Sequence, residues 1–251
     1  MPENHACPEI LRVRSLQKIV VEQPIPPTSE SKLEPLKSDA SLYHPFQFKR
    51  PAWTSSTETL HLAVGASLVM AVGLSMYGNI PDWVHLISYD MGGLIIPSAI
   101  FAFIFVSHEL AHKIVAKMYG LWAEFRLSMV GALLTLLSIA PIPLKIISPG
   151  FVMITGAADK KIIGLTSLAG PLLTIILTLM FFLSRFFITD GYLSLTILRG
   201  ASLGAWLALL NLMPFSIMDG AKVYWWNKKV WTISFISSVV LALAVSGHLP
   251  Y

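Results

Sequence analysis

Long apolar runs separated by short polar segments dominate the chain from about residue 58 onward. An α-helix needs about 20 predominantly apolar residues to cross the hydrocarbon core of a bilayer. Six runs reach that length, and they lie at residues 59–78, 93–116, 127–147, 162–186, 195–217 and 230–248. The pattern predicts an α-helical polytopic membrane protein with about five to six transmembrane helices.

The third run, 127–147, differs from the others. Pro141 and Pro143 interrupt it, and the segment that follows, SPGFVMITG, has the β-branched and aromatic residues typical of a strand. Non-helical backbone at membrane depth must lie against protein or a watery cavity, because lipid offers its N–H and C=O groups no hydrogen-bond partner. A re-entrant, partly β segment at this position, after the second run, is therefore expected to line a site.

The distribution of Lys and Arg distinguishes five spans from six. If all six runs cross with the N-terminus inside, the basic residues near the runs divide seven inside to six outside. If the third run enters and returns on the same side, eleven lie inside and Arg185 and Arg199 lie outside, as the positive-inside rule expects. We therefore predict five spans and one re-entrant segment, in a multi-pass protein of the cell membrane with its N-terminus towards the cytosol.

Composition supports a membrane location and narrows the range of partners. Hydrophobic residues make up 55% of the chain and charged residues 13%, about half the charged share of a typical soluble domain. The net charge of +4 arises mostly from loops between apolar runs, so we expect contact with a lipid bilayer and no nucleic acid. Residues 1–57, rich in Pro, Ser, Glu and Lys, are predicted to form a disordered or loosely ordered cytosolic tail. Residues 58–251 then form a membrane-embedded domain with its core at 93–222.

The second apolar run contains the sequence HELAH. His108 and His112 are four residues apart, so on a helix they project from one face and can bind one metal ion, with Glu109 beside them. Neutral imidazole suits zinc, and a catalytic zinc keeps three protein ligands and a water molecule whose pKa falls to about 7. We expect one Zn(II) per chain, with Glu109 as the general base towards the cytosolic side. The alternative is a pair of structural histidines hydrogen-bonded between helices.

A third metal ligand has to come from another part of the chain. Asp219 and Gly220 follow the fifth apolar run, at a depth where a carboxylate would otherwise need water. His108 lies about 12 Å from the inner end of its run at 1.5 Å per residue. Five spans place Asp219 on that same side and six spans place it on the opposite side, so Asp219 is the candidate third ligand in the predicted topology. The alternative is a carboxylate at a helix end near Lys222.

Three motifs follow one another in the chain: HELAH at 108–112, LAGPLL at 168–173 and NLMPFSIMDG at 211–220. On these motifs the sequence resembles the site-2 protease family of intramembrane zinc metalloproteases over about residues 93–222. The resemblance implies the following site residues: the zinc ligands His108, His112 and Asp219, the catalytic base Glu109 and the substrate-binding Asn211. It also implies a metalloendopeptidase whose substrate is a transmembrane protein or peptide, cut within or near the bilayer.

Other positions bear on how such a substrate is handled. The substrate must be held extended, and the predicted strand at Pro149–Thr155 is the candidate edge to which it adds. Gly170 and Pro171 either loosen the fourth run, which would admit substrate from the side, or are ordinary residues of a spanning helix. Asn211 has a second interpretation as well, an interhelical hydrogen bond. Lys113 is expected to extend towards the inner membrane interface. Many members of the family carry Asn three residues after the Gly-Pro pair, where this chain has Thr174.

Two other classes of function are open alternatives. A catalytically silent relative would bind membrane partners without cutting them, although the intact HELAH sequence and Asp219 argue against lost chemistry. A zinc-handling transporter would use the same ligands, but transporters usually show repeated halves with broken helices in matching positions, and this sequence shows neither.

Overall fold

The computed structural model describes residues 53–76, 90–140, 146–215 and 218–249, and all of these belong to one compact unit, Arg50–Tyr251. The predicted tail lies outside the described residues up to residue 52, so its character stays a prediction. Pro141 and Pro143 of the third apolar run also lie outside the described residues.

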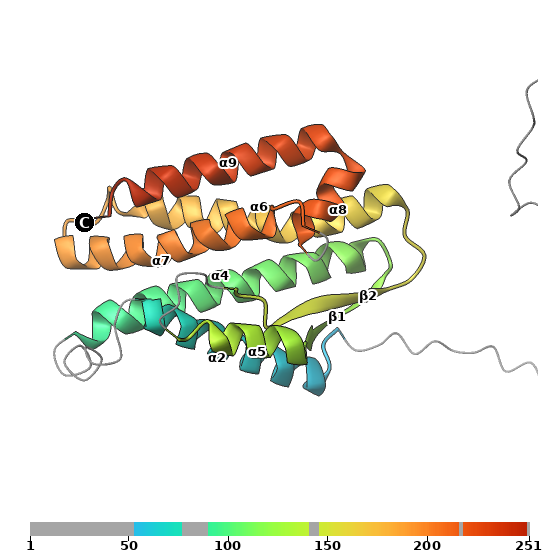
Figure 1. Ribbon diagram of the computed structural model, residues 1–251, viewed down its shortest axis with the longest axis horizontal. Helices are drawn as coiled ribbons and strands as arrows, with labels where there is room; N and C mark the ends of the chain where they lie inside the picture. Colours follow the sequence, from blue (N-terminus) through green and yellow to red (C-terminus); the bar gives the residue numbers. More distant parts are fainter. Residues whose placement is uncertain (1–52, 77–89, 141–145, 216–217, 250–251) are drawn as a thin grey trace, which may run out of the picture. The chain divides into compact units, whose positions relative to one another are not determined.

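The long helices of the described residues run along one another, as Figure 1 shows. They are α2 (Ser56–Met76), α4 (Met91–Met118), α6 (Lys160–Ser184), α7 (Gly191–Asn211) and α9 (Lys228–Ser246). Within the described ranges, these are the five helices long and apolar enough to cross a membrane, in agreement with the five predicted spans. The third apolar run forms only the nine-residue α5 (Met129–Leu137) in its described part, about 14 Å long and too short to cross. Its path relative to the bilayer stays a prediction.

Helix α4 packs against α2, α6 and α7. Its residues Phe101, Ile104 and Phe105 recur at intervals of three and four, so they share one face of the helix. That face is buried in the same apolar cluster as Val69 of α2 and Leu203 of α7. In a bilayer, such packing stabilises by close van der Waals contact rather than by removal from water, because lipid is as apolar as these side chains.

A two-stranded antiparallel sheet follows α4. Strand β1 (Trp122–Leu127) leaves α4 through a turn at Gly120, whose φ of 75° suits glycine. Its partner β2 (Gly150–Thr155) falls within the predicted strand. Sequence analysis predicts no strand at β1, where Glu124 is buried in the structure.

The sheet lies at one end of the helices, as Figure 1 shows. The same end holds α8 (Asp219–Trp226), the C-terminal end of α4 and the N-terminal end of α6. Helices α4 and α6 also pack directly on each other, and α8 packs on α6. This arrangement brings the HELAH helix and the start of α8 together although they are more than 100 residues apart in the sequence.

Candidate metal centre

Two buried histidines project from one face of α4. His108 and His112 are 3% and 6% exposed, and their Nε2 atoms lie 3.0 Å apart. Asp219, the first residue of α8, approaches from the opposite side with its Oδ2 atom 3.0 Å from Nε2 of His112 and 3.4 Å from Nε2 of His108. The structure thus brings together the three residues that sequence analysis selected as metal ligands.

These separations fit tetrahedral zinc. With zinc–ligand bonds of about 2.0–2.1 Å, the ligand atoms of a tetrahedral site lie about 3.3 Å from one another. The three measured distances, 3.0 to 3.4 Å, fall close to that value. Lys222 approaches the other carboxylate oxygen of Asp219, Oδ1, at 3.4 Å. The pairing with Lys222 and the approach to the histidines therefore use different oxygens.

The hydrogen bonds behind the histidines determine where their protons lie. Nδ1 of His112 is 2.7 Å from the carbonyl oxygen of Thr166, which can only accept, so this nitrogen carries a proton. The hydroxyl of Thr174 donates to the carbonyl of Gly170 at 3.0 Å, so it accepts from Nδ1 of His108 at 2.9 Å. In the neutral imidazoles both Nε2 atoms then present lone pairs.

Three electron-pair donors consequently converge on one point, with no proton between them when the imidazoles are neutral. Such a group repels itself unless a cation lies at the centre, and imidazole with carboxylate suits zinc. Hydrogen bonds from the outer nitrogen of a ligating histidine also fix the orientation of its ring. The residues present therefore fit a zinc ion.

Thr174 has a role that sequence reasoning missed. The resemblance identified it as a departure from the usual Asn, and the structure shows a hydroxyl that accepts from His108 and so orients that ring. The carbonyl of Thr166 does the same for His112, but a backbone oxygen leaves no sequence signal.

Gly170 explains how α6 approaches the histidines so closely. A Cβ atom at this position would lie 2.3 Å from Nε2 of His112 and 2.7 Å from Nε2 of His108. Helix α6 runs without a break through Pro171, so the pair does not interrupt the helix here. The structure favours close packing on the two candidate metal ligands, rather than loosening of the helix, as the reason for glycine.

Glu109 and Asn211 border the same cavity as the candidate ligands. This cavity has a volume of about 480 Å³, and side chains of β2 also line it, including Val152 and Ile154. Glu109 is 8% exposed and immediately follows His108 on α4. Asn211 ends α7 and donates from Nδ2 to the carbonyl of Leu207 at 2.9 Å. A buried carboxylate, an amide and a strand thus surround the three converging ligands.

Comparison with known proteins identifies one relative. The chain is 34% identical over 153 residues to a protein of Methanocaldococcus jannaschii named as a putative zinc metalloprotease. The aligned part covers 59% of this chain and 74% of the relative. No protein-family model matches the chain, and no solved structure matches it.

Proposed function

Because the chain belongs to the family of the Methanocaldococcus jannaschii zinc metalloprotease, we propose that it is an intramembrane metalloendopeptidase of the site-2 protease type. Its substrate is a membrane-spanning protein or peptide, and its active site faces the cytosol. One observation carries the proposal: two histidines, a carboxylate and a buried glutamate meet at the end of helices apolar enough to cross a membrane.

The chemistry follows from the residues around the metal position. His108, His112 and Asp219 hold the zinc ion, which when bound supplies the Lewis acidity that makes water a nucleophile near neutral pH. Glu109 takes the proton from that water and passes it to the leaving amine of the cut peptide bond. The burial of Glu109 keeps bulk water away from the carboxylate and strengthens its electrostatic interactions.

The register of the sheet supports β2 as the strand that holds the substrate. Ser128 donates to the carbonyl of Pro149, and the pairing continues with Arg126 opposite Phe151. Hydrogen-bonded pairs alternate with non-bonded pairs in an antiparallel ladder. The backbone N–H and C=O groups of Val152 and Ile154 therefore point away from β1.

An extended substrate segment can add to this outer edge of β2 by backbone hydrogen bonds. Val152 and Ile154 also line the cavity that contains Glu109, so a peptide on this edge passes beside the general base. We assign to Asn211, on the same cavity wall, a hydrogen bond to the substrate backbone. Unwinding the substrate exposes a carbonyl that would be shielded inside a helix.

The test is cleavage of a fluorogenic transmembrane-helix peptide by the purified protein in detergent, with zinc content measured in parallel. Wild-type protein should cleave, and Glu109→Gln should bind the same amount of zinc without cleaving. Cleavage retained in Glu109→Gln would refute the assigned base. Zinc flux in proteoliposomes that persists in Glu109→Gln, without cleavage by the wild type, would identify a transporter instead.

A further inference from the structure

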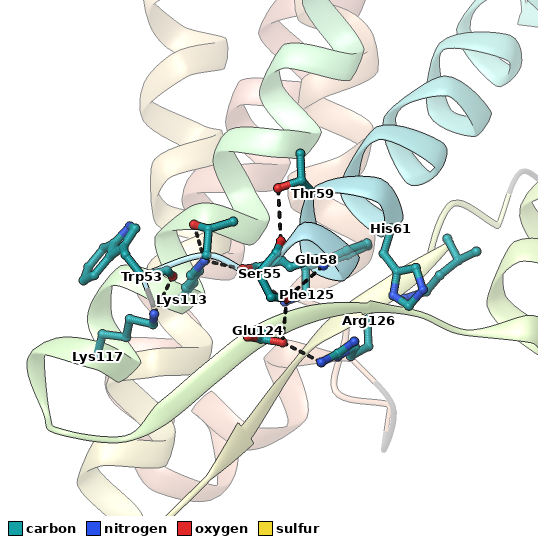
Figure 2. A network of polar contacts seen from close by, with 12 residues as sticks. Trp53, Ser55, Glu58, Thr59, His61, Lys113, Lys117, Glu124, Phe125 and Arg126 are labelled. Carbon is teal, nitrogen blue, oxygen red and sulfur yellow. Dashed lines mark hydrogen bonds and ion pairs between the residues drawn. The ribbon is translucent and has the colours of Figure 1, made fainter. Parts of the chain in front are cut away.

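Lys113 follows the metal-binding turn of α4 and is buried. Sequence analysis expects its ammonium group towards the inner membrane interface, and the structure shows that the side chain is only 2% exposed. Its Nζ atom lies 2.6 Å from Oε2 of Glu58 in α2, whose side chain is equally buried (Figure 2). The same Nζ atom lies 3.1 Å from Oγ1 of Thr54. The charged end of Lys113 therefore points into the protein, towards the start of α2.

Glu58 joins two elements with one carboxylate. Oε2 accepts a hydrogen bond from the ammonium group of Lys113, and Oε1 accepts one from the backbone N–H of Phe125 in β1 at 3.1 Å (Figure 2). The hydroxyl of Ser55 accepts a hydrogen bond from the backbone N–H of Glu58, as in a capping box. In a complete capping box, the glutamate side chain would also accept a hydrogen bond from the backbone N–H of the serine. Here both carboxylate oxygens bind other elements instead, so capping alone does not account for Glu58.

The start of α2 covers the edge of β1 that faces away from β2. The register directs the N–H groups of Phe125 and Leu127 to this edge, and they donate to Glu58 at 3.1 Å and to Nδ1 of His61 at 3.4 Å. Ser55 adds a bond to Glu124 at 3.3 Å. Because β1 is paired with β2, these bonds also hold the position of β2.

We propose that Glu58 and Lys113 are a positioning pair, which sets the distance between the metal-binding turn of α4 and the substrate edge of β2. This inference rests on the proposed function. Lys113 is four residues after Glu109, so it lies one helical turn beyond the general base on the same face. Through Glu58, that turn is connected to β1, and Phe125 lies directly opposite Val152 on β2.

The side chain of Phe125 makes the same connection through apolar contact. Its ring packs edge to face on Phe105 of α4, with ring centroids 6.1 Å apart, and Phe105 lines the cavity of the candidate active site. A displaced β1 would therefore move both the substrate edge and one wall of the cavity. Displacement of a substrate by about 1 Å can lower the rate of a reaction about a hundredfold.

The pair can be tested by a double-mutant cycle of Glu58→Leu, Lys113→Met and both together. Removing one member of a buried ion pair leaves an unpaired charge, whereas replacing both with apolar side chains is often tolerated. We expect each single variant to lower kcat/KM at least about tenfold while zinc content is unchanged. The double variant should lose less than the product of the two single losses, because the residues act as a unit.

Val72→Ala is the matched control. Val72 is a fully buried residue of α2, and it lies about 21 Å along the helix from Glu58. It should lower thermal stability without lowering kcat/KM of the folded, zinc-loaded protein. An equal loss of kcat/KM in Val72→Ala, or a double loss equal to the product, would overturn the proposal.

Amide hydrogen exchange gives a readout that does not depend on cleavage. Exchange at 122–127 should accelerate in Glu58→Leu and in the double variant, which both lack the acceptor for Phe125, and not in Val72→Ala. Unchanged exchange would overturn the proposal even if activity fell. If the wild type cleaves no peptide, the proposed function fails, and the exchange result still decides whether the pair holds β1. If the single variant Glu58→Leu does not fold, hydrogen exchange is measured on the double variant instead.

Discussion

Replacing Gly170 with alanine should remove zinc from the site. The added Cβ would lie 2.3 Å from Nε2 of His112 and 2.7 Å from Nε2 of His108, whereas ordinary van der Waals contact begins at 3.4 Å. The histidines or α6 must then move by about 1 Å, while metal sites tolerate deviations of about 0.2 Å in ligand distance. The three nearest atoms to the new methyl group all belong to His108 and His112, and two of them are the Nε2 atoms of the candidate ligands, so the strain falls on the metal centre itself.

The size of the effect follows from this displacement. Substitutions that remove only the hydrogen-bond partners of metal-ligating side chains lower metal affinity about 10–100-fold. Gly170→Ala acts on two ligands directly, so we expect zinc affinity to fall at least about 100-fold, which corresponds to about 2.8 kcal/mol. The assay is zinc content of the purified protein over a series of buffered free-zinc concentrations, with cleavage measured on the same samples.

Gly164→Ala is the matched control on the same helix. A Cβ at Gly164 would lie 2.3 Å from the ring of Trp226, so it is equally crowded but faces no metal ligand. This variant should lose thermal stability and keep zinc affinity within about threefold of the wild type, because Trp226 lies at the far end of α8, about 10 Å along the helix from Asp219. Wild-type zinc affinity in Gly170→Ala, or an equal loss in Gly164→Ala, would refute the argument.

Three further predictions test the ligands and the substrate edge. Thr174→Val removes the acceptor for Nδ1 of His108 and should weaken zinc binding about 10–100-fold in the same zinc titration, whereas Thr174→Ser should retain it. Asp219→Ala should abolish stoichiometric zinc and, with it, the rise in melting temperature that zinc causes in the wild type; a variant still stabilised by zinc would exclude Asp219 as a ligand. Proline at Val152, whose N–H points away from β1, should raise KM at least about tenfold with the fold retained. Proline at Met153 should instead lower the melting temperature, because it breaks the hydrogen-bonded ladder between β1 and β2. A normal KM in the Val152 variant would exclude the outer edge of β2 as the place where the substrate binds.

The long helices and the histidine pair were predictable from the sequence. Length and apolar content determine which segments can cross a bilayer, and the distribution of Lys and Arg selected five spans over six, in agreement with the five long helices. The spacing of His108 and His112 requires only helix geometry, because residues four apart share a face. These inferences use local or additive properties of the chain, and such properties can be read without knowing which elements pack together.

Sequence reasoning failed where burial depends on a distant partner. A lysine near a helix end normally extends its charged group into water. The ammonium of Lys113 instead pairs with the buried carboxylate of Glu58, 55 residues away. Strand β1 was missed for the same reason, since its buried Glu124 contacts Ser55 before α2, 69 residues away, as well as Arg126 beside it. In each case a long-range pairing outweighs the local preference.

The sequence by itself determined the class of protein and the types of ligand. Apolar length implies spanning helices, and an imidazole pair with a carboxylate suits a zinc ion where the three meet. The tertiary structure shows that Asp219 reaches the histidines, and it alone decided that Gly170 must lack a side chain and that the hydroxyl of Thr174 can take the place of an amide. The physical reason is distance, because a hydrogen bond or a metal ligand needs its partner placed to within a few tenths of an ångström, and only the packing of whole helices sets such positions.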